Sequence, residues 1–350
     1  MSTFVEVVSL QITKQIVAPF SIFVSWLMAF DLLYLVSAVT TKSATAIDFI
    51  LAYFLTNPSL VHKRGIVVII GCDSSVGIDA TYVLSKVGYH VIACSTKEQG
   101  LIKNANSAIS NLKFNSIVQK DIQKLAGLIE RELVRTNLDL VGLINCTASN
   151  YQPLLQPMEA TDSADWEQVF LTNVIGPMNA IKMLIPLIRQ SQGRIINVTC
   201  ASAMAANPLQ GPFSASMQAL EASTNCLRLE LQLFRVPVSL IQIGFLKSAI
   251  SPNSVINPTL QPSLERIYAP AVKARSAIQL EAKSNSLPVH YCTSAIKHAL
   301  TSPYPSPRYV VGLDAQFTSI TNLFISQRAQ DWIYQFFISS QVPKKVRFGN

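Results

Sequence analysis

Short apolar runs alternate with longer amphipathic segments from about residue 65 onward, and this alternation constrains the fold more than any other feature. The runs have the length of strands and the segments between them the length of helices. Strands separated by helices indicate repeated βαβ units, which place parallel strands in one sheet with helices on both faces. We expect strands at 66–70, 90–94, 116–119, 138–145, 194–199 and 238–243. We expect helices at 77–88, 98–111, 121–136, 163–190 and 212–234, in an α/β domain with a doubly wound parallel sheet.

A glycine turn follows the first expected strand and leads directly into the first expected helix. It contains Gly71, Ser75 and Gly77, and Ile78 continues into the helix. Such a turn lets the backbone approach a pyrophosphate, which then rests on the amino terminus of the helix. The flanking strand and helix favour a dinucleotide site here, and a plain strand-to-helix turn is the simpler alternative.

The spelling Gly71-Cys72-Asp73-Ser74 resembles the short-chain dehydrogenase/reductase family, in particular its retinol, hydroxysteroid and 3-hydroxybutyrate dehydrogenases. The resemblance covers roughly residues 65–316, including the C-terminal segments 298–302 and 308–315. It implies a Rossmann-like fold that binds NAD or NADP. Ser75 departs from the family pattern, Gly-x3-Gly-x-Gly, because it stands at the position of the middle glycine.

The resemblance also implies further cofactor-binding positions. Asp121 matches the acidic position whose carboxylate accepts from the adenine amino group, and Asn145 matches the asparagine after the fourth strand. Gly244 and Ser248 belong to a segment that resembles the one closing over the nicotinamide. Lys97 follows the second strand, where no aspartate stands to accept from a ribose hydroxyl. Lys97 in this position could pair with a 2′-phosphate, which slightly favours NADP(H). A lysine that is only solvated is an equally good interpretation.

The residues that the resemblance implies for proton transfer are replaced. Hydride transfer at an alcohol carbon needs a general acid or base within hydrogen-bond reach. The family uses a Tyr, a Lys one helical turn later that lowers the pKa of the Tyr, and a Ser upstream. Phe213, Met217 and Cys200 occupy these three positions, and only Asn173 matches the family's catalytic asparagine. Phe cannot donate a proton, Met cannot lower a pKa, and a thiol is a weak donor.

Three functions are compatible with this pattern. The first, which the sequence favours, is a catalytically impaired, membrane-attached scaffold that binds a steroid- or retinoid-like ligand, a protein partner, or NAD(P). The second is an active oxidoreductase whose proton donor is a bound water, the substrate, or a residue of the irregular or helical segment 250–290. The third is a structural subunit of a membrane complex. By analogy with the family, we expect a homodimer through 163–190 and 212–234.

The segment 16–40 is 25 residues long and carries one charge, Asp31. About 20 apolar residues in a helix cross a bilayer core, so we predict a membrane anchor within 1–62. The alternative is a cleaved signal peptide. Lys42, Lys63 and Arg64 outnumber Lys14, so the domain 63–316 should face the cytoplasm. With the resemblance, this predicts association with the endoplasmic reticulum membrane.

The composition supports membrane contact and argues against two other classes of protein. Hydrophobic residues make up 49% of the chain and charged residues 14%, which is more apolar than an ordinary soluble domain. The net charge of +8 is dispersed, and basic clusters without aromatic neighbours argue against a nucleic-acid partner. The six cysteines form no Cys-x-x-Cys pair, which argues against a zinc site or a disulfide framework. The tail 317–350 is amphipathic and suits core packing or membrane contact.

Overall fold

The computed structural model describes residues 61, 64–97, 107–147, 156–204, 207–246, 261–284, 286–332 and 335. The predicted anchor at 16–40, the cofactor position Ser248 and the end of the amphipathic tail lie outside the described residues.

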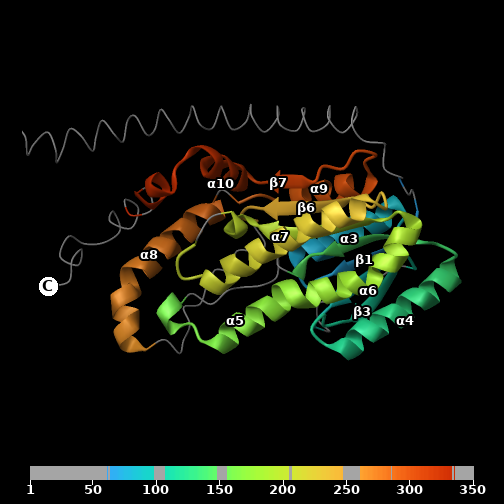
Figure 1. The fold of residues 1–350 in the computed structure, drawn as a ribbon, viewed down its shortest axis with the longest axis horizontal. Coiled ribbons are helices and arrows are strands. Elements are labelled where there is room, and N and C mark those ends of the chain that lie inside the picture. Colours follow the sequence, from blue (N-terminus) through green and yellow to red (C-terminus); the bar gives the residue numbers. More distant parts are fainter. Residues whose placement is uncertain are drawn as a thin grey trace, which may run out of the picture. The chain divides into compact units, whose positions relative to one another are not determined.

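One parallel sheet of seven strands organises the described residues, in the order β3-β2-β1-β4-β5-β6-β7 (Figure 1). The strands are β1 (Ile66–Ile70), β2 (His90–Ser95), β3 (Ile109–Lys113), β4 (Leu140–Asn145), β5 (Arg194–Cys200), β6 (Val238–Ile243) and β7 (Arg308–Val311). The strand order runs outward from β1 to β3, returns to β4 beside β1, and then runs outward to β7. Ligands of such sheets bind at the carboxyl ends of the strands, where the order reverses. The predicted doubly wound sheet is confirmed.

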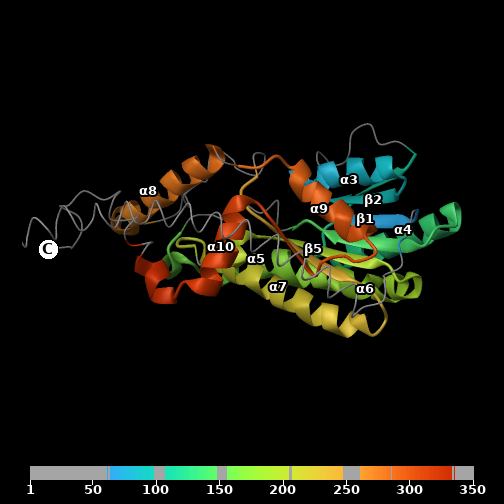
Figure 2. The same ribbon diagram turned by 90° about the horizontal axis from the view of Figure 1, so that it is seen from above.

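Helices cover both faces of this sheet, as Figure 2 shows for α3 and α9 on one side and for α6 and α7 on the other. The helices are α3 (Ser75–Val87), α4 (Gln119–Thr136), α5 (Ser163–Phe170), α6 (Gly176–Ser191), α7 (Gly211–Gln232), α8 (Pro262–Ser284), α9 (His290–Thr301) and α10 (Leu313–Phe324). A π-helical turn, η5 (Leu171–Ile175), joins α5 to α6. The segment 250–290 is helical over the length of α8.

Both faces are buried because side chains along each central strand alternate between two cores. In β1, Val67 and Ile69 pack in one core with α3 and α9. Ile66, Val68 and Ile70 pack in the second core with α4, α6 and α7. A strand buried on both faces reads as a continuous apolar run, which is why the central strands could be predicted from the sequence.

The predicted strand at 116–119 was wrong, and so was the end of the predicted helix 98–111, because β3 occupies Ile109–Lys113. β3 pairs with β2 alone and lies at the edge of the sheet. Ile109 is buried, and the residues after it alternate between partly buried and exposed. An edge strand with one solvated face lacks the continuous apolar run that identified the central strands.

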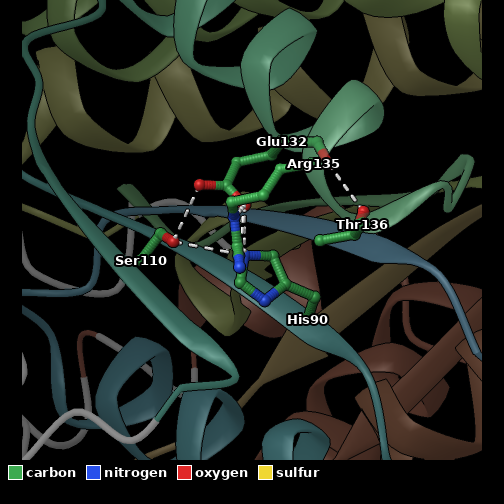
Figure 3. A network of polar contacts seen from close by, with 5 residues as sticks. All are labelled: His90, Ser110, Glu132, Arg135 and Thr136. Atoms are coloured by element: carbon green, nitrogen blue, oxygen red, sulfur yellow. Dashed lines mark hydrogen bonds and ion pairs between the residues drawn. The ribbon is translucent and has the colours of Figure 1, made fainter.

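A polar network holds this edge in register at the amino end of β2 (Figure 3). His90 Nε2 lies 3.1 Å from Ser110 Oγ on β3 and 3.1 Å from a carboxylate oxygen of Glu132 on α4. Burial lowers the pKa of His90, against the opposing effect of the Glu132 charge, so the imidazole is neutral near pH 7. Burial by itself raises the pKa of Glu132, but hydrogen bonds from Arg135 and the neighbouring charges bring it below its usual range.

Within the described part of the chain, one helical run, Ser163–Ser191, is long and apolar enough to cross a membrane. Ala180, Leu184 and Ile188 of this run belong to the second core, on the sheet. Its apolar character therefore reflects packing against the strands.

Candidate functional site

The glycine turn after β1 is held by close backbone contacts. Gly71 has a φ of 88°, a left-handed conformation that favours glycine. A Cβ at Gly71 would lie 2.8 Å from backbone atoms of Cys146 and Thr147, just after β4. A Cβ at Gly77 would clash with the Gly71 carbonyl oxygen. Both glycines are therefore required by the fold of the turn itself.

Ser74 closes the turn and begins the helix that follows. Its Oγ donates to the Gly71 carbonyl at 2.7 Å and accepts from the Gly77 N–H at 3.0 Å, as an N-cap of α3. Ser75 is the first residue of α3, and Ile78 lies partly exposed in its first turn. The amino terminus of α3, with its partial positive charge, thus lies at the carboxyl edge of the sheet beside the β1–β4 reversal. These residues fit a dinucleotide pyrophosphate.

Asn145 lies at the end of β4 and is fully buried. Its Nδ2 donates to Asn197 Oδ1 on β5 at 3.1 Å. Its Oδ1 accepts from the backbone N–H and the hydroxyl of Thr147, at 3.2 and 2.7 Å. Because the backbone of Thr147 lies close to Gly71, the hydrogen bonds of Asn145 to Thr147 stabilise the residues that contact the glycine turn.

The adenine assignment of Asp121 came from its match to the family's acidic position, and the strand expected at 116–119 before it lies instead at Ile109–Lys113. Asp121 lies in the first turn of α4, where its carboxylate accepts from Lys124 at 2.8 Å and from the Asn115 N–H at 3.0 Å. The Lys124 hydrogen bond leads the effects that lower its pKa. Asn115, two residues beyond Lys113 at the end of β3, is the polar residue that follows the actual strand. The role of Asp121 at the adenine stays a prediction.

The end of β2 contacts the glycine turn directly. Thr96 Oγ1 donates to Asp73 Oδ2 at 2.7 Å. Lys97 is exposed, and its backbone N–H and carbonyl are both hydrogen-bonded to Ser95 Oγ. The sequence predicted Lys97 at this place but not the carboxylate of Asp73, because 23 positions separate Asp73 from Thr96 along the chain.

The three residues predicted to occupy the family's catalytic positions meet in one apolar cluster. Phe213 and Met217 lie one turn apart on α7 and contact Cys200, at the end of β5, and Ala203. Met217 has no exposed surface and Phe213 is 6% exposed. The structure therefore brings together the residues that the sequence analysis grouped, and their side chains form an apolar cluster.

Asn173 lies beside this cluster in the π-helical turn η5, and such turns are frequent at functional sites. It is fully buried, and its Nδ2 donates to Ser216 Oγ at 3.0 Å. Ser216 Oγ in turn donates to the Phe213 carbonyl at 2.8 Å. Asn173 Oδ1 is buried without a hydrogen-bond partner among the described residues. Asn173, which was predicted to match the family's asparagine, is thus linked through Ser216 to the backbone of Phe213.

A charged network lies one further turn along α7. Glu221 accepts from Thr199 Oγ1 at 3.0 Å and from Gln242 Nε2 at 2.6 Å. It also pairs with Arg308 of β7 at 2.9 Å. These contacts join α7 to three strands, and the sequence analysis did not identify them because the partners are far apart in the chain.

The segment after β6 approaches α10 closely at Gly244. A Cβ on Gly244 would clash with the carboxylate of Asp314, in the first turn of α10. That carboxylate accepts from the Phe245 N–H at 2.7 Å. Gly244 thus allows Asp314 to hold the start of the segment that was expected to close over a nicotinamide.

A glycine turn and a helix amino terminus, at the carboxyl edge where the strand order reverses, define a dinucleotide-binding α/β domain. Residues 65–257, more than half of the chain, match the model of the short chain dehydrogenase family. The chain belongs to that family.

Two relatives agree with the subgroup that the motifs indicated. Retinol dehydrogenase 5 of Mus musculus is 26% identical over 288 residues, covering 78% of this chain and 88% of that protein. The mitochondrial D-beta-hydroxybutyrate dehydrogenase of Bos taurus is 27% identical over 270 residues, covering 69% of this chain and 75% of that protein.

Solved structures share the fold. A short chain dehydrogenase of Burkholderia cenocepacia in complex with NADP has a TM-score of 0.59 at 18% identity and covers 79% of this chain and 98% of its own. One from Streptomyces avermitilis has a TM-score of 0.62 at 16% identity, with the same coverage.

Proposed function

We propose that this chain is a catalytically impaired short-chain dehydrogenase that keeps its dinucleotide-binding turn and binds a lipophilic ligand of the retinoid or steroid class. The observation that carries the proposal is the packing of Phe213 and Met217 against Cys200 in an apolar cluster. A functioning site needs a hydroxyl at the first position and an ammonium at the second. A fully buried thioether provides neither.

The size of the loss follows from the chemistry. Positioned acid–base groups contribute about 10²–10⁴-fold to a rate, so turnover at this site falls by that order. The remaining polar groups do not replace the missing pair. Ser216 is hydrogen-bonded to Asn173 and to the Phe213 carbonyl, and Glu221 is paired with Arg308. When bound, a nicotinamide cofactor would supply or take a hydride, and it would rest on the Gly71–Gly77 turn.

The ligand class and the location are supported by separate features. Relatives of this chain include one named for retinol, a lipophilic alcohol. The apolar segment 16–40 and the basic residues after it support attachment to the endoplasmic reticulum membrane, with the domain 63–316 in the cytoplasm.

The test is turnover by the purified full chain in detergent micelles with NADH and NADPH, on a panel of retinoids and hydroxysteroids. We expect the wild type to be inactive and Cys200→Ser/Phe213→Tyr/Met217→Lys to recover measurable activity. Cys226→Ser, on the exposed side of α7, is the matched cysteine control and should stay inactive. Robust wild-type turnover that is abolished by Ser75→Trp, which blocks the cofactor turn, would refute the proposal.

One observation supports a second candidate, an oxidoreductase that uses a bound water as its proton donor. The buried Asn173 Oδ1, unpartnered among the described residues, suits an ordered water. This candidate requires that wild-type turnover be present and that Asn173→Ala abolish it.

A further inference from the structure

We propose that Asp73 makes the dinucleotide site selective for NAD(H) over NADP(H), because its carboxylate occupies the place where the hydroxyls of the adenosine ribose bind. The inference rests on the dinucleotide site of the proposed function. It concerns which cofactor binds, and is independent of whether turnover follows.

The contacts of the turn place Asp73 at the carboxyl end of β2. The N–H groups of Gly71 and Cys72 both donate to the Cys94 carbonyl, at 3.0 and 2.8 Å, and fasten the turn to that strand. Thr96 Oγ1 then donates to Asp73 Oδ2 at 2.7 Å, directly after β2 ends at Ser95. The Asp73 side chain is half-buried, so solvent screens it only in part.

Dinucleotide-binding domains usually carry an acidic side chain at the end of the second strand, where it accepts from the ribose 2′-hydroxyl. In this chain β2 ends in Ser95, Thr96 and Lys97, so that strand provides no carboxylate. Asp73, on the neighbouring glycine turn, places a carboxylate beside the end of β2. A carboxylate accepts several hydrogen bonds at once, so the bond from Thr96 is compatible with one from a ribose hydroxyl.

The same carboxylate disfavours NADP(H). A 2′-phosphate would bring its negative charges to within a few ångströms of Asp73, and like charges at an interface suppress the wrong partner. Lys97 is the basic residue from which the sequence predicted a preference for NADP(H). Its side chain is exposed, and a solvated ammonium interacts more weakly than a half-buried carboxylate at the same distance.

The experiment is a fluorescence titration of the full chain in detergent micelles with NADH and with NADPH, and the readout is the ratio of the two dissociation constants. We expect the wild type to bind NADH at least about 10-fold more tightly than NADPH. Asp73→Asn keeps the size of the side chain and an oxygen that accepts from Thr96, but removes the charge. We expect it to bring the ratio to within about 2-fold of one, mainly by tightening NADPH.

Two control variants separate this reading from its alternatives. Asp139→Asn removes an exposed carboxylate just before β4, at the amino ends of the strands and away from the carboxyl ends where Asp73 lies. It should leave the ratio unchanged. Lys97→Met should also leave the ratio unchanged. If this variant binds NADPH more weakly than the wild type does, the lysine contributes to cofactor selectivity. Thermal unfolding of each variant checks that the fold is retained.

The proposal is overturned if the wild type prefers NADPH, if Asp73→Asn leaves the ratio as it was, or if neither cofactor binds saturably. Turnover by the wild type would instead refute the proposed loss of catalysis and leave this ratio intact. The two proposals can therefore fail separately.

Discussion

Met217→Lys places a cation at the position predicted to correspond to the family's lysine, and we expect it to destabilise the free protein. Met217 has no exposed surface and packs with Phe213, Cys200 and Ala203. The introduced ammonium would enter an apolar cluster, where a charge costs several kcal/mol even after relaxation. Glu221, one turn later, already pairs with Arg308.

The loss in the free energy of unfolding has an upper limit, because the lysine can be buried as a neutral amine. Deprotonating a lysine of reference pKa about 10.4 at pH 7 costs about 4.6 kcal/mol, at 1.36 kcal/mol per unit. The charged form costs no more than this, because the side chain would otherwise neutralise. With a small loss of packing and some outward movement of the amine, we expect a loss of about 3–5 kcal/mol in the free energy of unfolding.

The assay is equilibrium urea unfolding of wild type, Met217→Lys and Met217→Leu, followed by circular dichroism. Met217→Leu conserves volume and should cost less than about 1.5 kcal/mol. The lysine variant should become more stable as the pH rises, because its unfolded state binds more protons than its folded state. A loss below about 1 kcal/mol for Met217→Lys, independent of pH, would mean that position 217 meets solvent. The argument for a hydrocarbon-filled site would then be wrong.

Three further changes test the turn and the two polar networks. Gly77→Ala places a Cβ against the Gly71 carbonyl, so we expect a loss of about 2–4 kcal/mol in thermal unfolding and weaker NADH binding. His90 is held neutral by burial, with its pKa below the usual value of about 6.5, so acidification below that pH favours the unfolded chain, and stability measured by urea should fall there. The Glu132 carboxylate, whose pKa is also lowered, adds a further loss only below its ordinary pKa of about 4.3. Glu221→Gln leaves a guanidinium without its charge partner, and we expect a loss of about 1–3 kcal/mol in thermal unfolding.

Matched variants control for each change. Gly127→Ala, on α4, places a Cβ with no atom within 4 Å and should not destabilise the protein. His290→Gln removes an exposed histidine and should leave the acid-side loss in place. Glu230→Gln neutralises an exposed carboxylate of α7 and should be close to neutral. Equal losses for the two glycine variants, or for the two glutamate variants, would refute the contact at Gly77 or at Glu221. An acid-side loss that disappears in His290→Gln would refute its assignment to His90.

The strands that the sequence predicted well are those buried on both faces. β1 is a continuous apolar run, and β4 and β6 are mostly apolar, because every residue of these three strands is buried. β3 was misplaced because it lies at an edge of the sheet and has no continuous apolar run. Its polar Ser110 is instead hydrogen-bonded to His90 and Glu132. Asn115 lies two residues after β3, and Asp121 lies in the first turn of α4.

The catalytic positions show the same division. The mapping of Phe213, Met217 and Cys200 to one site needed only their spacing and the motifs around them. Whether the site had been rebuilt around other polar groups could not be predicted, because it depends on which side chains meet across η5, α7 and β5. The Asn173–Ser216–Phe213 chain of hydrogen bonds spans 43 residues at its first step.

The sequence by itself determined the parallel sheet, the glycine turn and the grouping of Phe213, Met217 and Cys200. These are local properties, set by apolar periodicity, by backbone freedom at glycine and by the chemistry of single side chains. Only the tertiary structure decided what surrounds them: the closed apolar packing of Met217, the pairing of Glu221 with Arg308, and the approach of Asp73 to the end of β2. Each of these depends on contacts between residues that the chain separates widely and that the sheet order brings together, because burial and charge pairing are properties of a place in the fold.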